Sequence, residues 1–240
     1  MYDGQAASNP KLALAGISSG YGAINIVNAL SLTVAKGEIF ALMGKNGMGK
    51  TTLLKTILGF VAVRAGEIKL DGASIIGTSP SSLISSGVGY APQEHALFQD
   101  LTVRDNLRLA LRSDAGLDTA FEGIYRHFPF LKDRLGQKAG TLSGGEQKML
   151  ILGRALMLRP KLLLIDEISE GLQPTVVASI ATALKEERRL NDTTILMVEQ
   201  NLDFALGVAD RWAVLKLGQI DDTGDVASGS RARILEHLKI

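Results

Sequence analysis

Two glycine-rich segments, each placed where a helix is expected to begin, constrain this chain more than any other feature. The first reads GKNGMGKTT over residues 44–52, and the second reads LSGGEQ over residues 142–147. A nearly continuous apolar run, 38–43, precedes the first segment, and helix-forming residues follow it up to Gly59. Because backbone N–H groups at a glycine-rich helix start bind anions, both segments are predicted to hold phosphate.

The first segment, called the phosphate loop below, matches the nucleotide pattern G-x-x-x-x-G-K-[ST] from Gly44 to Thr51. The glycines let the backbone approach phosphates closely. Lys50 is expected to bridge the β- and γ-phosphates, and the Thr51 hydroxyl is expected to bind Mg²⁺. A chance glycine turn would not combine a buried strand, a lysine and a helix start in this register. The residues predicted to bind the nucleotide in this loop are Asn46, Gly47, Gly49, Lys50, Thr51 and Thr52.

A second apolar run, 162–165, ends in two acids, Asp166 and Glu167. Asp166 suits a direct or water-mediated role at Mg²⁺. Glu167 is then placed to orient and deprotonate an attacking water, which is worth about 10²–10⁴ in rate for a well-placed base. Acids that merely cap the next loop are common at strand ends, so it is the phosphate loop upstream that favours the catalytic interpretation.

The second glycine segment also has a purely structural interpretation. Ser143 is a good N-cap for a helix over 146–158, and a well-capped helix needs nothing more. The exposed amides at this helix start would nonetheless form a second anion site. One chain has little use for two triphosphate sites around one acidic pair, whereas two chains arranged head to tail would share both sites.

Composition excludes several other kinds of protein. The chain has 240 residues, of which 46% are hydrophobic, enough for one sizeable core or a core plus a small subdomain. Lys and Arg number 26 against 25 Asp and Glu, a balance that provides no field for nucleic acid or anionic lipid. There is no cysteine, no secretory core in residues 1–11, and no apolar run near the roughly 20 residues of a membrane helix. We therefore expect a protein that is soluble, or that is held at a membrane by a partner.

Alternating strand and helix patterns predict an α/β fold with a largely parallel sheet. Strands are expected at 12–15, 30–34, 38–43, 67–70, 162–165 and 194–198, with a hairpin over 212–223. Helices are expected at 51–58, 146–158, 176–190 and 231–239. Residues 87–159 differ, since Leu107 and Phe121 lie in helical patterns there, so this stretch is predicted to form a helical subdomain.

The complete string LSGGEQ, together with the phosphate loop, resembles the ATP-binding cassette (ABC) family, whose signature reads LSGGQ or LSGGE. The resemblance covers about residues 12–224 and implies one domain, 11–240, after a short polar tail, 1–10. The implied fold is a P-loop nucleoside triphosphatase cassette with a RecA-like parallel-sheet core (11–86 and 160–240), an antiparallel β subdomain and a helical subdomain (about 87–159). In the family two subunits enclose two ATP molecules, and the signature of each faces the phosphate loop of the other. The signature residues that this arrangement places against ATP are Ser143, Gly144, Gly145 and Glu146.

Two more positions match the family residue by residue, and a third departs from it. Tyr21 stands where the family places an aromatic side chain that stacks on adenine, although alone it would be read as an ordinary aromatic at a strand end. Gln93 matches the glutamine that reaches Mg²⁺ and the attacking water. Gln200 replaces the switch histidine, and it can bond a γ-phosphate but cannot carry positive charge. The resemblance therefore implies a catalytic set of Glu167, Gln200 and Gln93, and a Mg²⁺ site of Thr51, Gln93 and Asp166.

Some strings indicate a subgroup of the family. The strings SEGL at 169–172 and VEQN at 198–201 resemble the second ATPase of bacterial branched-chain amino-acid importers. Gln173, where the family usually has aspartate, and Pro174 look more like the urea importer ATPases, so the cargo stays open. Export stays open too, because nothing in the nucleotide site encodes the direction of transport.

The subgroup implies an ATP-hydrolysing subunit that powers an importer as a peripheral protein on the cytoplasmic face of the inner membrane. Its expected partners are transmembrane permease subunits, a second ATPase subunit in a heterodimer or homodimer, and indirectly a periplasmic substrate-binding protein. ATP and Mg²⁺ are the expected cofactors, and no nucleic acid is expected. The apolar residues Leu97, Phe98 and Leu101 either line the groove that receives a permease's coupling helix or belong to ordinary core.

Two other classes of ABC protein fit less well. Repair and chromosome-organising members carry a zinc module or a long coiled coil between the glycine segments, and residues 52–141 have neither cysteines nor sustained heptads. Translation-factor members carry two cassettes per chain, and this chain has one. A non-hydrolysing regulatory cassette is disfavoured by the intact Glu167 and weakly favoured by Gln200.

Overall fold

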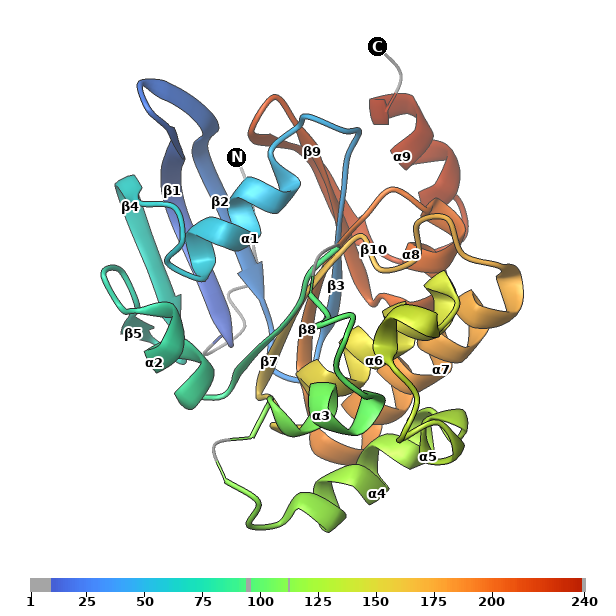
Figure 1. Cartoon of the computed structure of the whole chain (residues 1–240). Helices are drawn as coiled ribbons and strands as arrows, with labels where there is room; N and C mark the ends of the chain where they lie inside the picture. The colour runs from blue at the N-terminus through green and yellow to red at the C-terminus, as the bar shows by residue number, and fades with distance from the viewer. Residues whose placement is uncertain (1–9, 94–95, 112, 239–240) are drawn as a thin grey trace.

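Two β-sheets and a group of helices make up residues 10–93, 96–111 and 113–238, which are the residues that the computed structural model describes (Figure 1). Within these residues the smaller sheet is antiparallel, in the order β2-β1-β4-β5, and consists of β1 Leu12–Tyr21, β2 Ile24–Val34, β4 Val63–Leu70 and β5 Ala73–Ser74. The larger sheet has the order β10-β9-β3-β8-β7-β6, with only the edge strand β10 antiparallel to its neighbour. Its strands are β3 Ile39–Met43, β6 Val88–Ala91, β7 Leu162–Asp166, β8 Thr194–Glu199, β9 Arg211–Lys216 and β10 Gln219–Asp225.

The helices cover both faces of the larger sheet. Two lie on the same side as the antiparallel sheet, α1 Lys50–Ile57 and α2 Pro80–Ser85. The others lie on the opposite side: α3 Val103–Arg108, α4 Leu117–His127, α5 Phe130–Asp133, the short 3₁₀ turn Ala139–Thr141, α6 Gly144–Leu156, α7 Pro174–Asn191, α8 Leu202–Val208 and α9 Ser230–Leu238. No helix in the described part of the chain is long and apolar enough to span a membrane.

Strand β3 shows why the larger sheet is buried on both faces. Ile39, Ala41 and Met43 pack into the core formed with the helices α3 to α9, whereas Phe40 and Leu42 pack against α1 and the antiparallel sheet. Successive side chains of a strand point to opposite faces, so a strand covered on both sides reads as one apolar run. The predicted α/β architecture with a largely parallel sheet is confirmed.

One boundary differs from the expectation. Residues 87–159 were expected to be helical, but Val88–Ala91 forms β6, which pairs in parallel with β7 at the edge of the larger sheet. The helices of this part of the chain therefore begin after Ala91. Figure 1 shows α3, α4 and α5 grouped together below the sheet, with α6 leading from this group back to β7.

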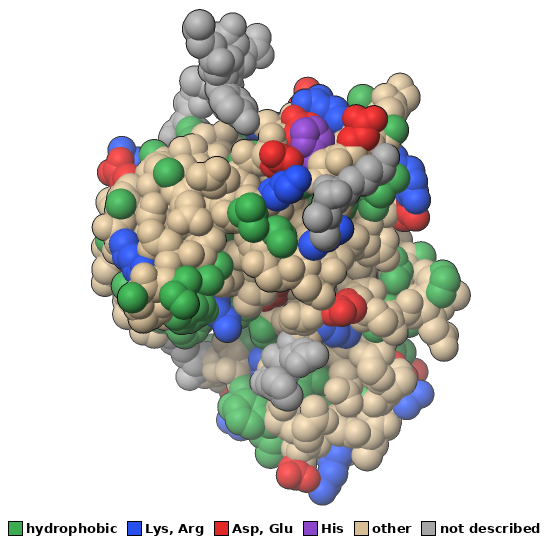
Figure 2. All heavy atoms as spheres, turned by 90° about the horizontal axis from the view of Figure 1, so that it is seen from above, with side chains coloured by type: hydrophobic (Ala, Val, Ile, Leu, Met, Phe, Trp, Pro, Cys, Tyr) green, Lys and Arg blue, Asp and Glu red, His purple; other side chains and the backbone are tan. Residues whose placement is uncertain are grey.

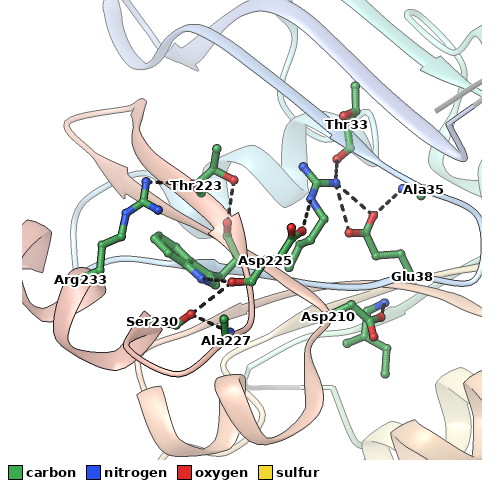
Figure 3. Close-up of polar contacts among 12 residues, drawn as sticks. Thr33, Ala35, Glu38, Asp210, Thr223, Asp225, Ala227, Ser230 and Arg233 are labelled. Atoms are coloured by element: carbon green, nitrogen blue, oxygen red, sulfur yellow. Dashed lines mark hydrogen bonds and ion pairs between the residues drawn. The ribbon is translucent and has the colours of Figure 1, made fainter. Parts of the chain in front are cut away.

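Polar contacts fix the end of the larger sheet that lies away from the phosphate loop (Figure 3). Glu38, just before β3, accepts a hydrogen bond from the Ala35 N–H at 2.6 Å and pairs with the Arg211 guanidinium at 3.2 Å. Asp210 accepts from the Ile39 N–H at 2.9 Å. Burial raises the pKa of Glu38, and the hydrogen bonds oppose that effect. These contacts anchor the amino ends of β3 and β9 side by side.

Charges of both signs lie side by side on one face of the molecule (Figure 2). Figure 2 shows acidic and basic side chains interspersed on the face seen from above. The ion pairs of α9 agree with this, since Arg233 lies 2.5 Å from Asp222 and His237 lies 2.8 Å from Asp221. The near-zero net charge of the chain is therefore also balanced locally in this region.

Candidate functional site

The predicted catalytic segments meet at the carboxyl ends of three adjacent parallel strands. The phosphate loop follows β3, Asp166 ends β7 and is followed by Glu167, and Gln200 follows β8. The order β3-β8-β7 in the sheet places these three ends next to one another. Ligands of open α/β sheets bind outside the carboxyl ends of the strands, so the topology itself favours a site here.

The phosphate loop leaves backbone donors free for an anion. Gly47 and Gly49 have left-handed backbones, with φ of 80° and 102°, which glycine adopts without strain. Helix α1 has no side-chain cap at Gly49 and no acid in its first turn. The first N–H groups of a helix have no partner within the helix, and here no side chain supplies one. The loop is therefore a ready anion site at the positive end of a helix dipole.

Lys50 is held inside the loop rather than extended into solvent. Its ammonium donates to the carbonyl oxygens of Gly44, at 2.7 Å, and Lys45, at 3.0 Å. It also pairs with the Glu167 carboxylate, with 2.9 Å between Nζ and Oε1, and the two side chains are only 3% and 5% exposed. The carboxylate of Glu167 thus balances the charge of the Lys50 ammonium inside the protein.

Asp166 is buried and faces the hydroxyl of Thr51. Thr51 Oγ1 donates to Asp166 Oδ1 at 3.1 Å, and the Tyr90 hydroxyl approaches Asp166 Oδ2 at 3.4 Å. Burial raises the pKa of Asp166, and burial together with the Asp166 charge raises the pKa of Tyr90. Mg²⁺ takes hard oxygen ligands and needs only one or two carboxylates beside phosphate and water, so Thr51 and Asp166 fit this ion. No group of three or more His, Cys, Asp or Glu side chains suited to a metal occurs among the described residues.

Glu167 is the point on which the other predicted catalytic residues converge. Its Oε2 accepts from Gln93 Nε2 at 3.1 Å and from Gln200 Nε2 at 2.7 Å. Gln200 also donates to the Asn46 side chain at 2.7 Å, which ties the glutamine to the phosphate loop. Glu167 itself has a left-handed backbone, φ 44°, an unusual conformation for a residue with a side chain and one that clusters at functional sites.

Four further residues touch this site that the sequence did not single out. Tyr90 contacts Asp166, and Glu170 accepts from Gln93 Nε2 at 2.6 Å. Lys148 of α6 donates to the backbone carbonyl of Gln93, which is 55 positions away in the sequence. The fourth is Glu199, which is buried and bonded to Ser169. Glu170 and Glu199 lie in the strings SEGL and VEQN, which indicated a subgroup but gave these two residues no role, and only the fold brings all four residues to the site.

The signature segment lies apart from the phosphate loop of the same chain. Ser143 caps α6, and it forms a capping box with Glu146: Glu146 N–H donates to Ser143 Oγ at 3.3 Å, and Ser143 N–H donates to Glu146 Oε2 at 2.8 Å. Ser143 and Gly144 are exposed, and Gly145 fits closely beside Val176, because an added Cβ would lie 3.0 Å from it. Figure 1 shows α6 on the opposite side of the larger sheet from α1. The helices that begin at the signature and at the phosphate loop of one chain therefore lie on opposite sides of the larger sheet.

Tyr21 ends β1 at the tip of the β1–β2 hairpin. Its side chain is 51% exposed, and β2 passes beside the phosphate loop, where Ile26 would lie 3.2 Å from a Cβ at Gly49. An aromatic ring is therefore available near the loop, and its stacking on adenine stays a prediction. Of the three apolar residues after Gln93, Leu97 is buried in the core, whereas Phe98 is 58% and Leu101 is 38% exposed.

Comparisons with known proteins agree with this geometry. A family model described as "ABC transporter" matches residues 27–170. The high-affinity branched-chain amino acid transport ATP-binding protein BraG of Pseudomonas aeruginosa is 40% identical over 87% of this chain and 91% of its own length. The probable branched-chain amino acid transport ATP-binding protein LivF of Archaeoglobus fulgidus is 34% identical over 93% of each chain. The lipopolysaccharide export system ATP-binding protein LptB of Escherichia coli is also 34% identical, over 93% of this chain and 92% of its own.

A solved structure gives the same result for the fold. The crystal structure of the ADP conformation of an ATP-binding cassette of an ABC transporter matches with a TM-score of 0.85, at 26% identity over 95% of each chain. The fold, the nucleotide-binding motifs and the relatives all lead to one assignment. The chain belongs to the ABC transporter family, whose ATPase cassette it carries.

Proposed function

We propose that this chain is the ATP-hydrolysing subunit of a bacterial importer for branched-chain amino acids. The observation that carries the proposal is the convergence of Gln93, Gln200 and Lys50 on Glu167, because it assembles a base beside a phosphate loop. The 40% identity to the branched-chain amino acid ATP-binding protein of Pseudomonas aeruginosa supports the choice of cargo. Cytoplasmic placement at the inner membrane follows from this role.

Glu167 has the position of a general base. Gln93 and Gln200 hold its Oε2, so Oε1 is the oxygen left to accept a proton once Lys50 turns to a γ-phosphate oxygen. Bound nucleotide would thus release the base from its ion pair. Thr51, Gln93 and Asp166 would hold Mg²⁺, which neutralises charge on the β- and γ-phosphates.

Gln200 gives this site a neutral hydrogen bond where a histidine could supply a charged one. A neutral hydrogen bond contributes about 0.5–1.5 kcal/mol and a charge-assisted one about 1.5–3 kcal/mol. The difference corresponds to on the order of tenfold in rate. Hydrolysis is retained in this proposal because Glu167 is present and correctly bonded.

The proposal requires partner subunits. The exposed signature residues Ser143 and Gly144 would face the phosphate loop of a second ATPase subunit, in a heterodimer or a homodimer. Exposed Phe98 and Leu101 would meet the permease, beside a surface hollow of about 590 Å³ that Leu101 and Leu109 help to line. A periplasmic binding protein would deliver cargo through the permease and would not touch this chain.

A second candidate is an importer of urea or short amides. Gln173 and Pro174 favour it through their resemblance to urea importer ATPases. Gln173 stands at the N-cap of α7 without making a side-chain cap, and it is exposed, so no structural role within the chain accounts for this glutamine.

The test is uptake of labelled leucine and labelled urea in cells that lack the gene. The cells are complemented with wild type, with Glu167→Gln, or with Glu236→Gln, an exposed acid of α9 that serves as the matched control. Loss of leucine uptake that wild type and the control restore, and Glu167→Gln does not, is the expected result. Loss of urea uptake alone would favour the amide importer. Unchanged uptake of both cargoes would overturn the import proposal, and full rescue by Glu167→Gln would remove Glu167 from its role.

A further inference from the structure

The buried carboxyl group of Glu199 lies next to the candidate site, and the proposed mechanism assigns it no role. The residue ends β8, directly before Gln200, and it is 1% exposed. We propose that Glu199 is a positioning residue for ATP hydrolysis, whose carboxyl group holds the loop after Glu167 against the loop that carries Gln200. The inference rests on the proposed ATPase function.

Both oxygens of Glu199 are bound to the loop that follows Glu167. The Ser169 N–H donates to Oε1 at 3.1 Å, and the Ser169 hydroxyl donates to Oε2 at 2.8 Å. Ser169 is itself only 3% exposed, so water does not compete for these bonds. The Asn201 backbone also bonds the carboxyl group, which joins the loop after β8 to the same point.

These bonds close a ring of contacts around the base. Ser169 lies two residues after Glu167, and Gln200 next to Glu199 donates back to Glu167 at 2.7 Å. Glu170, the residue after Ser169, accepts from Gln93 at 2.6 Å. The Glu167 main chain has its own anchor, since its N–H donates to the Val198 carbonyl at 3.0 Å. Glu199 therefore fixes the part of the loop that this backbone bond does not reach.

The two loops joined by this ring border a surface hollow. A hollow of about 310 Å³ lies between them and is lined by Glu167, Ser169, Glu170, Gly171, Leu172, Glu199, Gln200 and Asn201. Ile168 and Leu202 anchor the two loops in the apolar core, and the bonds of Glu199 to Ser169 join the loops beside this hollow. Removing the Glu199 carboxyl group would let Gln200 and Gln93 move away from Glu167. A displacement of about 1 Å in a catalytic group lowers the rate on the order of 10²-fold.

Glu199 also adds a titration near neutral pH. Burial raises the pKa of Glu199 to about 7, and the charge of Glu167 contributes to the shift. The other titratable groups at the hollow are Glu167 and Glu170, and Lys50 reaches it through its ion pair with Glu167. The two forms of Glu199 bond Ser169 differently, because only the ionised form accepts at both oxygens without carrying a proton.

The experiment compares two substitutions of Glu199 with the same two at Glu38. Glu38 is a second buried glutamate of the same sheet, at the end away from the nucleotide, and it is 6% exposed. Glu199→Leu removes the link, and Glu199→Gln keeps a hydrogen-bonding side chain that cannot ionise. The full-length chain is assayed for kcat and for KM of MgATP between pH 6 and pH 9, with thermal unfolding of each variant as a measure of stability.

We expect Glu199→Leu to lower kcat at least tenfold, with KM changed less than twofold. Glu199→Gln should keep kcat within threefold of wild type at pH 7 and should flatten the pH profile around pH 7. The Glu38 variants should lose stability while kcat stays within twofold of wild type. If Glu199→Leu does not fold, Ser169→Ala tests the same link and should lower kcat about threefold to tenfold.

Three other outcomes would overturn the positioning role or the proposed function. Wild-type kcat and pH profile in the Glu199 variants and in Ser169→Ala would overturn the positioning role. Equal losses of kcat in the Glu38 and Glu199 variants would also overturn it, because they would mean general destabilisation. Absence of ATP turnover by wild type, both alone and together with its second ATPase subunit and permease, would instead overturn the proposed function, and the inference with it.

Discussion

The ion pair between Lys50 and Glu167 gives a sharp prediction about the nucleotide-free protein. Both side chains are almost fully buried, and Nζ lies 2.9 Å from Oε1. Replacing Lys50 by Met would leave Oε1 of Glu167 without its partner. Breaking a buried pair in this way costs about 3–5 kcal/mol. Because Gln93 and Gln200 still bond the other carboxylate oxygen, we expect the lower end, a loss of about 3 kcal/mol in the free energy of unfolding.

The measurement is urea unfolding without nucleotide and with Mg²⁺ chelated. A loss of about 3 kcal/mol is a large part of the roughly 5–15 kcal/mol that stabilises a typical domain, so the midpoint should shift clearly at an unchanged m value. The double variant Lys50→Met with Glu167→Gln removes both charges and should recover at least half of the loss. Lys55→Met, on the same helix but outside the site, should change stability by less than about 1 kcal/mol.

The reasoning is refuted if Lys50→Met unfolds within about 1 kcal/mol of wild type. Strict additivity of the two substitutions would also contradict it, because residues in direct contact should couple. Either result would mean that solvent or a rearranged Glu167 compensates the lost ammonium.

Three further predictions concern the switch position, the buried acid and the signature. Gln200→His should raise turnover at saturating MgATP by up to about tenfold, as measured by phosphate release, and an unchanged rate would show that the neutral amide suffices. The pKa of Glu199 is raised from 4.5 to about 7, so its contribution to stability is complete below pH 4.5 and is lost as pH rises through 7. Relative to Glu199→Gln, wild type should therefore lose on the order of 3 kcal/mol between pH 5 and pH 8 in urea unfolding, and a relative gain would contradict the shift. Ser143→Ala should cost about 1 kcal/mol of stability through the lost cap while nucleotide affinity of the single chain stays unchanged by calorimetry, and weaker binding would mean that the signature serves its own chain's nucleotide.

Local patterns predicted most of the larger sheet and its helices. The apolar runs at β3, β7 and β8 are visible because both faces of these strands are buried, and α1 begins within one residue of its expected start. β6 was missed because it is four residues long, and its strand character comes from pairing with β7, more than 70 positions later. β2 begins at Ile24 rather than at residue 30, since the alternation is broken where Ala29 takes a left-handed backbone.

The candidate site likewise contains residues that local patterns predicted and residues that only the fold brings together. Its motif residues were identified because the phosphate loop and the acidic pair are contiguous strings with a chemical meaning. Tyr90 and Glu199 were assigned no chemical role, although Glu199 belongs to the string VEQN, because their partners lie 76 and 30 positions away. Nothing in the sequence says that Glu167 and Lys50 pair without nucleotide, because that contact depends on the distance between β3 and β7 across β8.

Because α1 and α6 are capped differently, the two glycine-rich segments can be altered independently of each other. The start of α1 has no side-chain cap and suits an outside anion, whereas the start of α6 is capped by Ser143 and Glu146. The helix start at the signature is therefore capped by side chains of its own chain, whereas the helix start at the phosphate loop is not. A damaged phosphate loop and a damaged signature could then be placed in different copies of the chain, and a pair formed by the two different copies would keep one intact composite site.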